Sequence, residues 1–296
     1  GIPDFLPSLK FEGREPDRLD FARWLVRRDN PLTARVQVNR AWERLFGWGL
    51  VSTQEDFGTQ GEPPSNQALL DHLAVRFMDL GWSWKSLCRE IVLSATYQQD
   101  SARRDLAGVD DPDNLLLARG PRFRLDAEAI RDSALAVSGR LDQSMFGPPV
   151  FPPQPPGIWQ VTYNNSAWQA AEDGDRYRRG LYTFWRRTAP YPSMMSFDAS
   201  SRETCLSRRV RTNTPLQALV TLNDEAFIEA AGGLALRADT ESTGGSDAFL
   251  NRAFRLAVSR APRPEELVIL RRLLAEETTR FRSRPEDARA LVDAGR

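Results

Sequence analysis

The sequence contains few residues that bind metals or form covalent cross-links. It has one histidine, His72, and two cysteines, Cys88 and Cys205, in 296 residues. It contains neither a CxxC nor a CxxCH motif, the patterns typical of structural zinc and of covalently attached haem. We therefore expect no metal and no cofactor in this chain. Whether the two cysteines form a disulfide cannot be judged from their spacing.

Long apolar runs and an excess of charge are also missing. Because no apolar run reaches about 18 residues, we expect no membrane span. The 40 basic and 40 acidic residues give a formal net charge of +0, which argues against nucleic acid as a partner. Lys10 and Lys85 are the only lysines. This bias is typical of a GC-rich genome, although arginine also binds carboxylate, sulfate or phosphate in a bidentate manner.

Helical periodicity dominates the chain. The hydrophobic fraction of 41% is sufficient for a buried core. Apolar residues recur at helical spacing after capping residues such as Asp17, Asn30 and Ser83, and Gly47 and Gly81 follow two of these segments. The pattern predicts helices over residues 17–28, 30–46, 66–80, 84–98, 126–141, 177–188, 215–222, 224–237, 247–259, 264–281 and from 285. We therefore predict a mostly α fold with little or no sheet.

A long irregular insertion interrupts this pattern at about residues 142–180. Residues 147–159, GPPVFPPQPPGIW, are rich in proline, and such long loops are functional or disordered in most domains. Trp159 and Trp168 argue against disorder. If they are buried, they anchor the insertion to the core; if they are exposed, they form a platform on which sugar rings stack.

A stretch rich in Ser, Thr and Gly at residues 239–246 divides the sequence into two parts. We expect residues 1–238 to form a helical core that includes the irregular insertion. Residues 239–296 are expected to form C-terminal helices that pack on the same unit.

Arginines concentrate between residues 197 and 223, together with a carboxylate and a cysteine, and just before an apolar helix that begins at Thr214-Pro215. The candidate ligand-binding residues in this stretch are Asp198, Arg202, Cys205, Arg208, Arg209, Arg211 and Asn213.

Three interpretations of this arginine cluster remain open. Asp198 and the arginines form a buried ion-pair network that holds a loop on the helical core. Alternatively, the arginines bind an anion, such as a sulfated or uronic-acid glycan, beside the helix N-terminus. In the third interpretation Cys205 is a thiolate nucleophile, but the only histidine, His72, is distant in sequence.

A pair of carboxylates would suffice for glycoside cleavage. The chain offers too many candidates to select a pair from the sequence. They are Asp56, Asp126, Glu128, Asp132 and Asp198. Whether the chain is an enzyme therefore stays open.

Several short motifs, taken in order, resemble a known family. The motifs are residues 30–36 (NPLTARV), 38–40 (VNR), 46–51 (FGWGLV), 56–58 (DFG), 81–83 (GWS), 94–97 (SATY), 124–132 (RLDAEAIRD), 197–199 (FDA) and 213–219 (NTPLQAL). The chain resembles, over nearly its whole length, the C-terminal helical domain of unknown function of secreted planctomycete proteins. That domain usually follows a second uncharacterised domain and often a planctomycete cytochrome c domain.

The resemblance implies an extracytoplasmic location, haem-bearing and other domains of the same polypeptide as partners, and a link to the breakdown of complex polysaccharides. It supplies no catalytic residues. Family members commonly have a histidine where this sequence has Asn66, so no role of that histidine transfers. Members also continue into a further helix, and no signal peptide precedes Gly1, so we expect a segment of a longer protein.

We therefore expect an accessory module that binds an anionic or complex polysaccharide. The alternative is a carbohydrate-active enzyme that uses a carboxylate pair with assistance from arginine.

Overall fold

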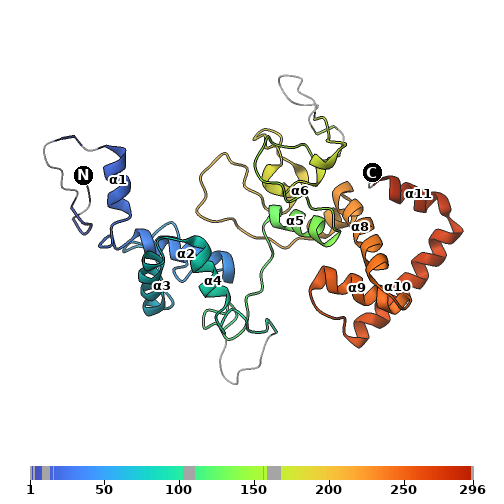
Figure 1. The fold of residues 1–296 in the computed structure, drawn as a ribbon, viewed down its shortest axis with the longest axis horizontal. Coiled ribbons are helices and arrows are strands. Elements are labelled where there is room, and N and C mark those ends of the chain that lie inside the picture. Colours follow the sequence, from blue (N-terminus) through green and yellow to red (C-terminus); the bar gives the residue numbers. More distant parts are fainter. Residues whose placement is uncertain are drawn as a thin grey trace. The chain divides into compact units, whose positions relative to one another are not determined.

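The computed structural model describes residues 2, 4–8, 14–15, 17–102, 111–155, 157–158 and 168–294. Within these ranges the regular elements are eleven α-helices and two short 3₁₀-helices, with isolated β-bridges but no strand (Figure 1). The predicted mostly α fold is confirmed. The chain forms two compact units, Gly1–Phe123 and Arg124–Arg296. No helix in the described ranges is long and apolar enough to cross a membrane.

The first unit contains α1 (Arg18–Leu25), α2 (Thr33–Phe46), α3 (Gln67–Asp79) and α4 (Trp84–Val92). Capping residues set most of these limits. The Asp17 carboxylate accepts a hydrogen bond from the N–H of Asp20 at the start of α1, and Gly47 ends α2 with φ of 89°. The side chain of Asn66 caps α3. Helix α4 ends earlier than predicted because the Ser94 hydroxyl bonds the carbonyl of Ile91 and turns the chain.

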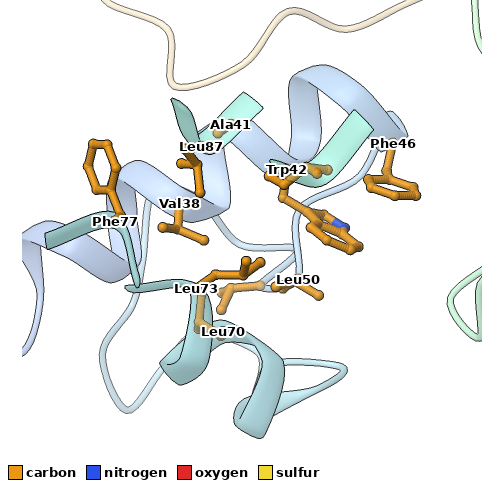
Figure 2. Close-up of a cluster of buried hydrophobic side chains, with 11 residues drawn as sticks. Val38, Ala41, Trp42, Phe46, Leu50, Leu70, Leu73, Phe77 and Leu87 are labelled. Carbon is orange, nitrogen blue, oxygen red and sulfur yellow. The ribbon is translucent and has the colours of Figure 1, made fainter. Parts of the chain in front are cut away.

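The core of the first unit lies where α2 packs on α3 and α4. Figure 2 shows Val38 of α2 pointing toward Leu73 of α3, with Leu87 of α4 nearby. Phe77 is 1% exposed. Trp42 and Phe46 stack with ring centroids 4.0 Å apart at one end of this cluster.

The second unit contains α5 (Ala127–Val137), α6 (Pro192–Ser196), α7 (Pro215–Asn223), α8 (Glu225–Glu241), α9 (Ser246–Val258), α10 (Pro264–Ser283) and α11 (Pro285–Ala294). Helix α8 contacts α5, α7, α9 and α11, while α10 contacts α9 and α11 (Figure 1). Helices α9 and α11 therefore pack on α8, and α10 packs on α9 and α11.

The helix predicted over residues 177–188 is wrong. One 3₁₀-helix, Gly174–Tyr177, ends where this range begins, a second, Gly180–Tyr182, lies inside it, and residues 183–188 form no helix. Besides a few local turn bonds, the backbone of this range bonds the insertion: the N–H of Val150 donates to the carbonyl of Tyr182 at 2.8 Å, and the N–H of Phe184 donates to the carbonyl of Val150 at 2.8 Å. These long-range hydrogen bonds are incompatible with one continuous helix.

Buried side chains anchor this irregular chain. The guanidinium of Arg178, which is 6% exposed, donates to the carbonyl oxygens of Phe146 and Pro148. The Tyr191 hydroxyl donates to the carbonyl of Pro153 at 2.7 Å, and burial raises the pKa of Tyr191 to about 12. The insertion is therefore tied to the helices by polar contacts as well as by apolar packing.

Candidate functional site

The arginine-rich segment between α6 and α7 lies against the N-terminal end of α5. Its first residues turn sharply, since Asp198 has a φ of 59° and Arg202 a φ of 62°. Its end is fixed at α7, where Thr214 and Gln217 form a capping box. The segment thus has an ordered path at both ends although it contains no helix.

Three arginine–carboxylate pairs hold this segment to the chain around α5. Arg209 forms a bidentate pair with Glu128, with N–O distances of 2.6 and 2.9 Å. Arg124 pairs with Asp198. Arg211 pairs with Asp126, and its Nε lies 3.5 Å from that carboxylate. These are the contacts of the first sequence interpretation, in which the arginines fix a loop.

The pairing lowers the pKa of two of these carboxyl groups. Burial raises the pKa of Glu128, but the hydrogen bonds and charge of Arg209, aided by the charge of Arg202, lower it below its ordinary value. Burial also raises the pKa of Asp198, and the hydrogen bonds from Thr212 and the charge of Arg124 more than offset that rise. Both groups are therefore carboxylates near neutral pH and poor general acids.

We expect the second unit to lose stability below about pH 4 through these groups. Because the pKa values of Glu128 and Asp198 are lowered on folding, the unfolded chain binds more protons in acid. Their contribution is complete above the ordinary carboxyl pKa and is lost as the pH falls through the folded values. Thermal unfolding between neutral pH and about pH 3 checks this. A double variant, Glu128→Gln with Asp198→Asn, should show a shallower decline; an equal decline would contradict the assignment.

The rest of α5 holds the end of the insertion. Arg131, which is 6% exposed, donates to the carbonyl of Arg176 at 2.6 Å. The Asp132 carboxylate accepts the N–H of Gly180 at 2.6 Å and pairs with Arg179 at 3.1 Å. The charged side chains of residues 124–132 therefore all bind irregular chain, which explains their density in this motif.

Arg202 differs from Arg124, Arg209 and Arg211. Its guanidinium carbon lies 4.9 Å from the centroid of the Trp185 ring, and the residue is exposed. The described residues provide no carboxylate within ion-pair distance of it. The Trp185 indole N–H is itself fixed, since it donates to the carbonyl of Ser201 at 3.3 Å. The guanidinium thus lies over the indole ring and is exposed to solvent. Arg208 and Asn213 are also exposed.

Comparison with known proteins identifies the family of this chain. The family described as PSD1, protein of unknown function (DUF1553), matches residues 17–274. The chain belongs to this family. No curated protein and no solved structure matches it.

Neither cysteine of this PSD1 chain forms a disulfide, since Cys88 and Cys205 are both free. Burial raises the pKa of the Cys88 thiol, which disfavours the reactive thiolate. Cys205 is exposed, but the only histidine, His72, belongs to the other unit. The described residues contain no group of three potential metal ligands.

Of the two candidate tryptophans in the insertion, Trp168 can be placed in the structure. Trp168 is half-buried, its indole N–H donates to the carbonyl of Pro152 at 2.8 Å, and its ring stacks on Tyr191 at 5.9 Å. It serves as an anchor in this structure. Trp159 lies outside the described residues.

The sequence did not indicate Trp185 as a component of the candidate site. Its motif, WRR at residues 185–187, resembles the other aromatic–arginine pairs of the chain, and 16 residues separate Trp185 from Ser201. The signal that distinguishes it is the left-handed backbone at Arg202, which a sequence does not display.

Proposed function

We propose that this chain is an accessory, non-catalytic module that binds anionic polysaccharide through the surface around Arg202. The observation that carries the proposal is the stacked guanidinium of Arg202 on Trp185, exposed and without a carboxylate partner in the described chain. A guanidinium held in one plane presents two parallel donors that match a carboxylate or sulfate group. Uronic acids and sulfated sugars carry such groups.

The backbone at Arg202 supports a role beyond packing. A positive φ of 62° is unfavourable for a residue with a long side chain. Such conformations cost on the order of 1–3 kcal/mol and concentrate at ligand sites. Because Arg202 is exposed, its own burial does not offset this cost. A contact between Arg202 and a ligand would explain an arginine at this position.

The surrounding charges define the ligand class. Glu128 lies close enough for the charge of Arg202 to lower its pKa, but Arg209 already neutralises it. An anionic polymer gains from the positive charge of Arg202, and it gains more than a neutral one at low ionic strength.

A glycoside hydrolase is the weaker alternative. It requires a carboxylic acid that remains protonated and a nearby carboxylate. Glu128 and Asp198 have lowered pKa values and are held by arginines. Both groups are therefore suited to fixing the loop rather than to donating a proton.

The proposed setting follows from the family resemblance. An extracytoplasmic protein with haem-bearing domains on the same polypeptide would use this module to hold a polysaccharide while another domain acts on it. The haem and the chemistry would then belong to those other domains, and the present chain would bring no cofactor of its own.

Replacing Arg202 with alanine should lower the affinity for dextran sulfate or polygalacturonate by about 10- to 100-fold, because one charge-assisted contact contributes about 1.5–3 kcal/mol. The melting temperature should change little. Isothermal titration calorimetry at two salt concentrations measures the affinity. Arg272→Ala is the matched control, since Arg272 is 73% exposed and has only a distant pair with Glu276 at 3.8 Å.

Equal losses in the two arginine variants would show that binding follows net charge alone. Binding of neutral dextran as strong as that of dextran sulfate would contradict an anion site at Arg202. Either result would leave the polysaccharide proposal without its structural basis.

A further inference from the structure

A cavity in the first unit combines an aromatic wall with polar groups that have no partner. Its volume is about 170 Å³, far above the ~10–15 Å³ that one water molecule needs. Trp42, Phe46 and Leu50 form its inner wall, and each of them is exposed by 7% or less. These three residues lie at the same end of the hydrophobic cluster in Figure 2. The cavity therefore has a floor that belongs to the core.

Trp48 stands at the rim of this cavity and is 46% exposed. Its backbone is fixed on both sides. Gly47 has a left-handed φ of 89°, and at Gly49 an added Cβ would lie 2.6 Å from the amide nitrogen of Asn39. Asn39 in turn bonds the backbone of Val51. The chain thus holds a large aromatic side chain at the surface on a rigid support.

The opposite wall is a turn that bonds to itself. The Asp111 carboxylate accepts the N–H groups of Leu115 and Leu116 at 2.8 and 2.9 Å. Asn114 adopts a φ of 56° and donates its side-chain amide to the carbonyl of Arg119 at 2.9 Å. Leu115 and Leu116 remain 52% and 71% exposed. This wall is preformed, so a ligand would gain apolar contacts without ordering it.

Three polar side chains complete the lining. The carboxylate of Asp113 and the hydroxyl of Ser65 have no hydrogen bond or ion pair to any described residue. The Asn66 carbonyl oxygen caps α3, which leaves the amide N–H₂ of that side chain uncommitted. The cavity therefore offers a strong acceptor, a donor and a hydroxyl that does both.

We propose that this cavity binds one ring of a neutral sugar, stacked on Trp48 with its hydroxyls toward Asp113, Ser65 and Asn66. A sugar ring has an apolar face of C–H groups and an edge of hydroxyls that donate and accept. The negative charge of Asp113 disfavours an acidic sugar. The cavity lies in the first unit, and it takes a neutral ring, so it does not depend on the anion site at Arg202.

An organic cation is the competing ligand class, because aromatic rings and a carboxylate bind quaternary ammonium groups. The uncommitted donor of Asn66 argues against it, since a quaternary ammonium group accepts no hydrogen bond. Choline therefore enters the experiment as the competitor that distinguishes the two classes.

The test uses the whole chain and a panel of neutral tetrasaccharides built from glucose, xylose, mannose or galactose. Saturation-transfer NMR reports sugar protons that contact protein, and the indole N–H signal of Trp48 reports the site. At least one probe should shift that signal, and Trp48→Ala and Asp113→Ala should each weaken binding by about tenfold or more. Trp84→Ala removes a tryptophan that is 43% exposed in the same unit and should leave binding unchanged.

Arg202→Ala should also leave neutral-sugar binding unchanged, which separates this proposal from the anion site. The proposal is overturned if no probe shifts the Trp48 signal. It is equally overturned if Trp84→Ala weakens binding as much as Trp48→Ala, or if choline shifts the Trp48 signal and none of the sugars does.

Discussion

Replacing Glu229 with alanine is expected to lower the free energy of unfolding of the second unit by about 3–5 kcal/mol. The carboxylate of Glu229, whose side chain is 8% exposed, lies 3.0 Å from Arg140 and 3.0 Å from Arg176. It also accepts the hydroxyl of Tyr177 at 2.6 Å. Removing it leaves two guanidinium groups and a phenol without their common acceptor. Differential scanning calorimetry should show a melting temperature lower by roughly 6–20 °C.

Two further variants show whether burial of this network is the cause. Glu241→Ala changes a carboxylate at the end of the same helix that pairs with Arg237 and Arg252 at the surface, and it should have a much smaller effect. Tyr177→Phe removes only the phenol hydroxyl and should cost about 1 kcal/mol. A loss for Glu229→Ala no larger than for Glu241→Ala would mean that the network does not stabilise the fold.

The network also shows what the sequence could not predict. Its members are contributed by α8, by the turn after α5 and by a 3₁₀-helix, and 52 residues separate Tyr177 from Glu229. The apolar spacing of α8 predicted a helix, but nothing in that spacing marks Glu229 as a buried residue. With 40 acidic and 40 basic side chains available, the pairing depends on tertiary geometry.

Helix positions were predictable because their signals are local. The caps at Asp17 and Ser83 and the glycine after α2 lie within a few residues of the helix ends that they set. Prolines at the first positions of α7 and α10 act in the same local way. A helix ends earlier than predicted where a side chain bonds a backbone carbonyl of its last turn, as Ser94 does at the end of α4.

The sequence predicts that arginines concentrate in the candidate site. It does not predict which of them are paired with carboxylates and which are exposed to a ligand. Arg202, Arg209 and Arg211 have the same local chemistry in the sequence, yet their environments differ: Arg209 and Arg211 face carboxylates near α5, and Arg202 stacks on Trp185. The partners come from sequence segments far from the cluster. Which arginine remains available to a ligand is therefore a property of the fold.

The helix predicted over residues 177–188 was wrong for a related reason, because long-range contacts decide the structure of this range. Aromatic and β-branched residues in this range support a strand, while their spacing also fits one helical face. The buried Arg178 decides between them, because its guanidinium bonds carbonyls of the insertion more than 25 residues earlier. The extended path lets the backbone pair with Val150.

Replacing Asn39 with leucine is expected to destabilise the first unit by about 2–6 kcal/mol, because two buried backbone groups lose their partners at about 1–3 kcal/mol each. Asn39 is 0% exposed. Its amide donates to the carbonyl of Val51 at 2.9 Å, and its side-chain oxygen accepts the N–H of Val51 at 2.8 Å. Leucine has a similar size but satisfies neither group. Chemical unfolding followed by tryptophan fluorescence measures the loss.

Asn39→Asp separates the hydrogen bonds from the packing. The carboxylate retains the acceptor for the N–H of Val51 but places an oxygen against the Val51 carbonyl, where the amide donated. Burial of the new carboxylate raises its pKa in the folded chain, so the folded chain binds more protons than the unfolded chain at moderately acidic pH. The variant should therefore recover stability relative to wild type as the pH falls, since a protonated carboxyl can donate again. The leucine variant should show no such recovery.

The substitutions of Asn39 also test whether this residue positions Trp48 at the sugar cavity. Asn39 fixes Val51, which follows Trp48 by three residues, and its amide lies against Gly49. If this contact positions Trp48, the indole N–H signal of Trp48 should shift in Asn39→Asp under conditions where the chain remains folded. Ser83→Ala, which removes the side-chain cap of α4 worth about 1 kcal/mol and does not line the cavity, is the control. An unchanged Trp48 signal, together with a stability loss no larger than that of Ser83→Ala, would show that Asn39 supports neither the core nor the cavity.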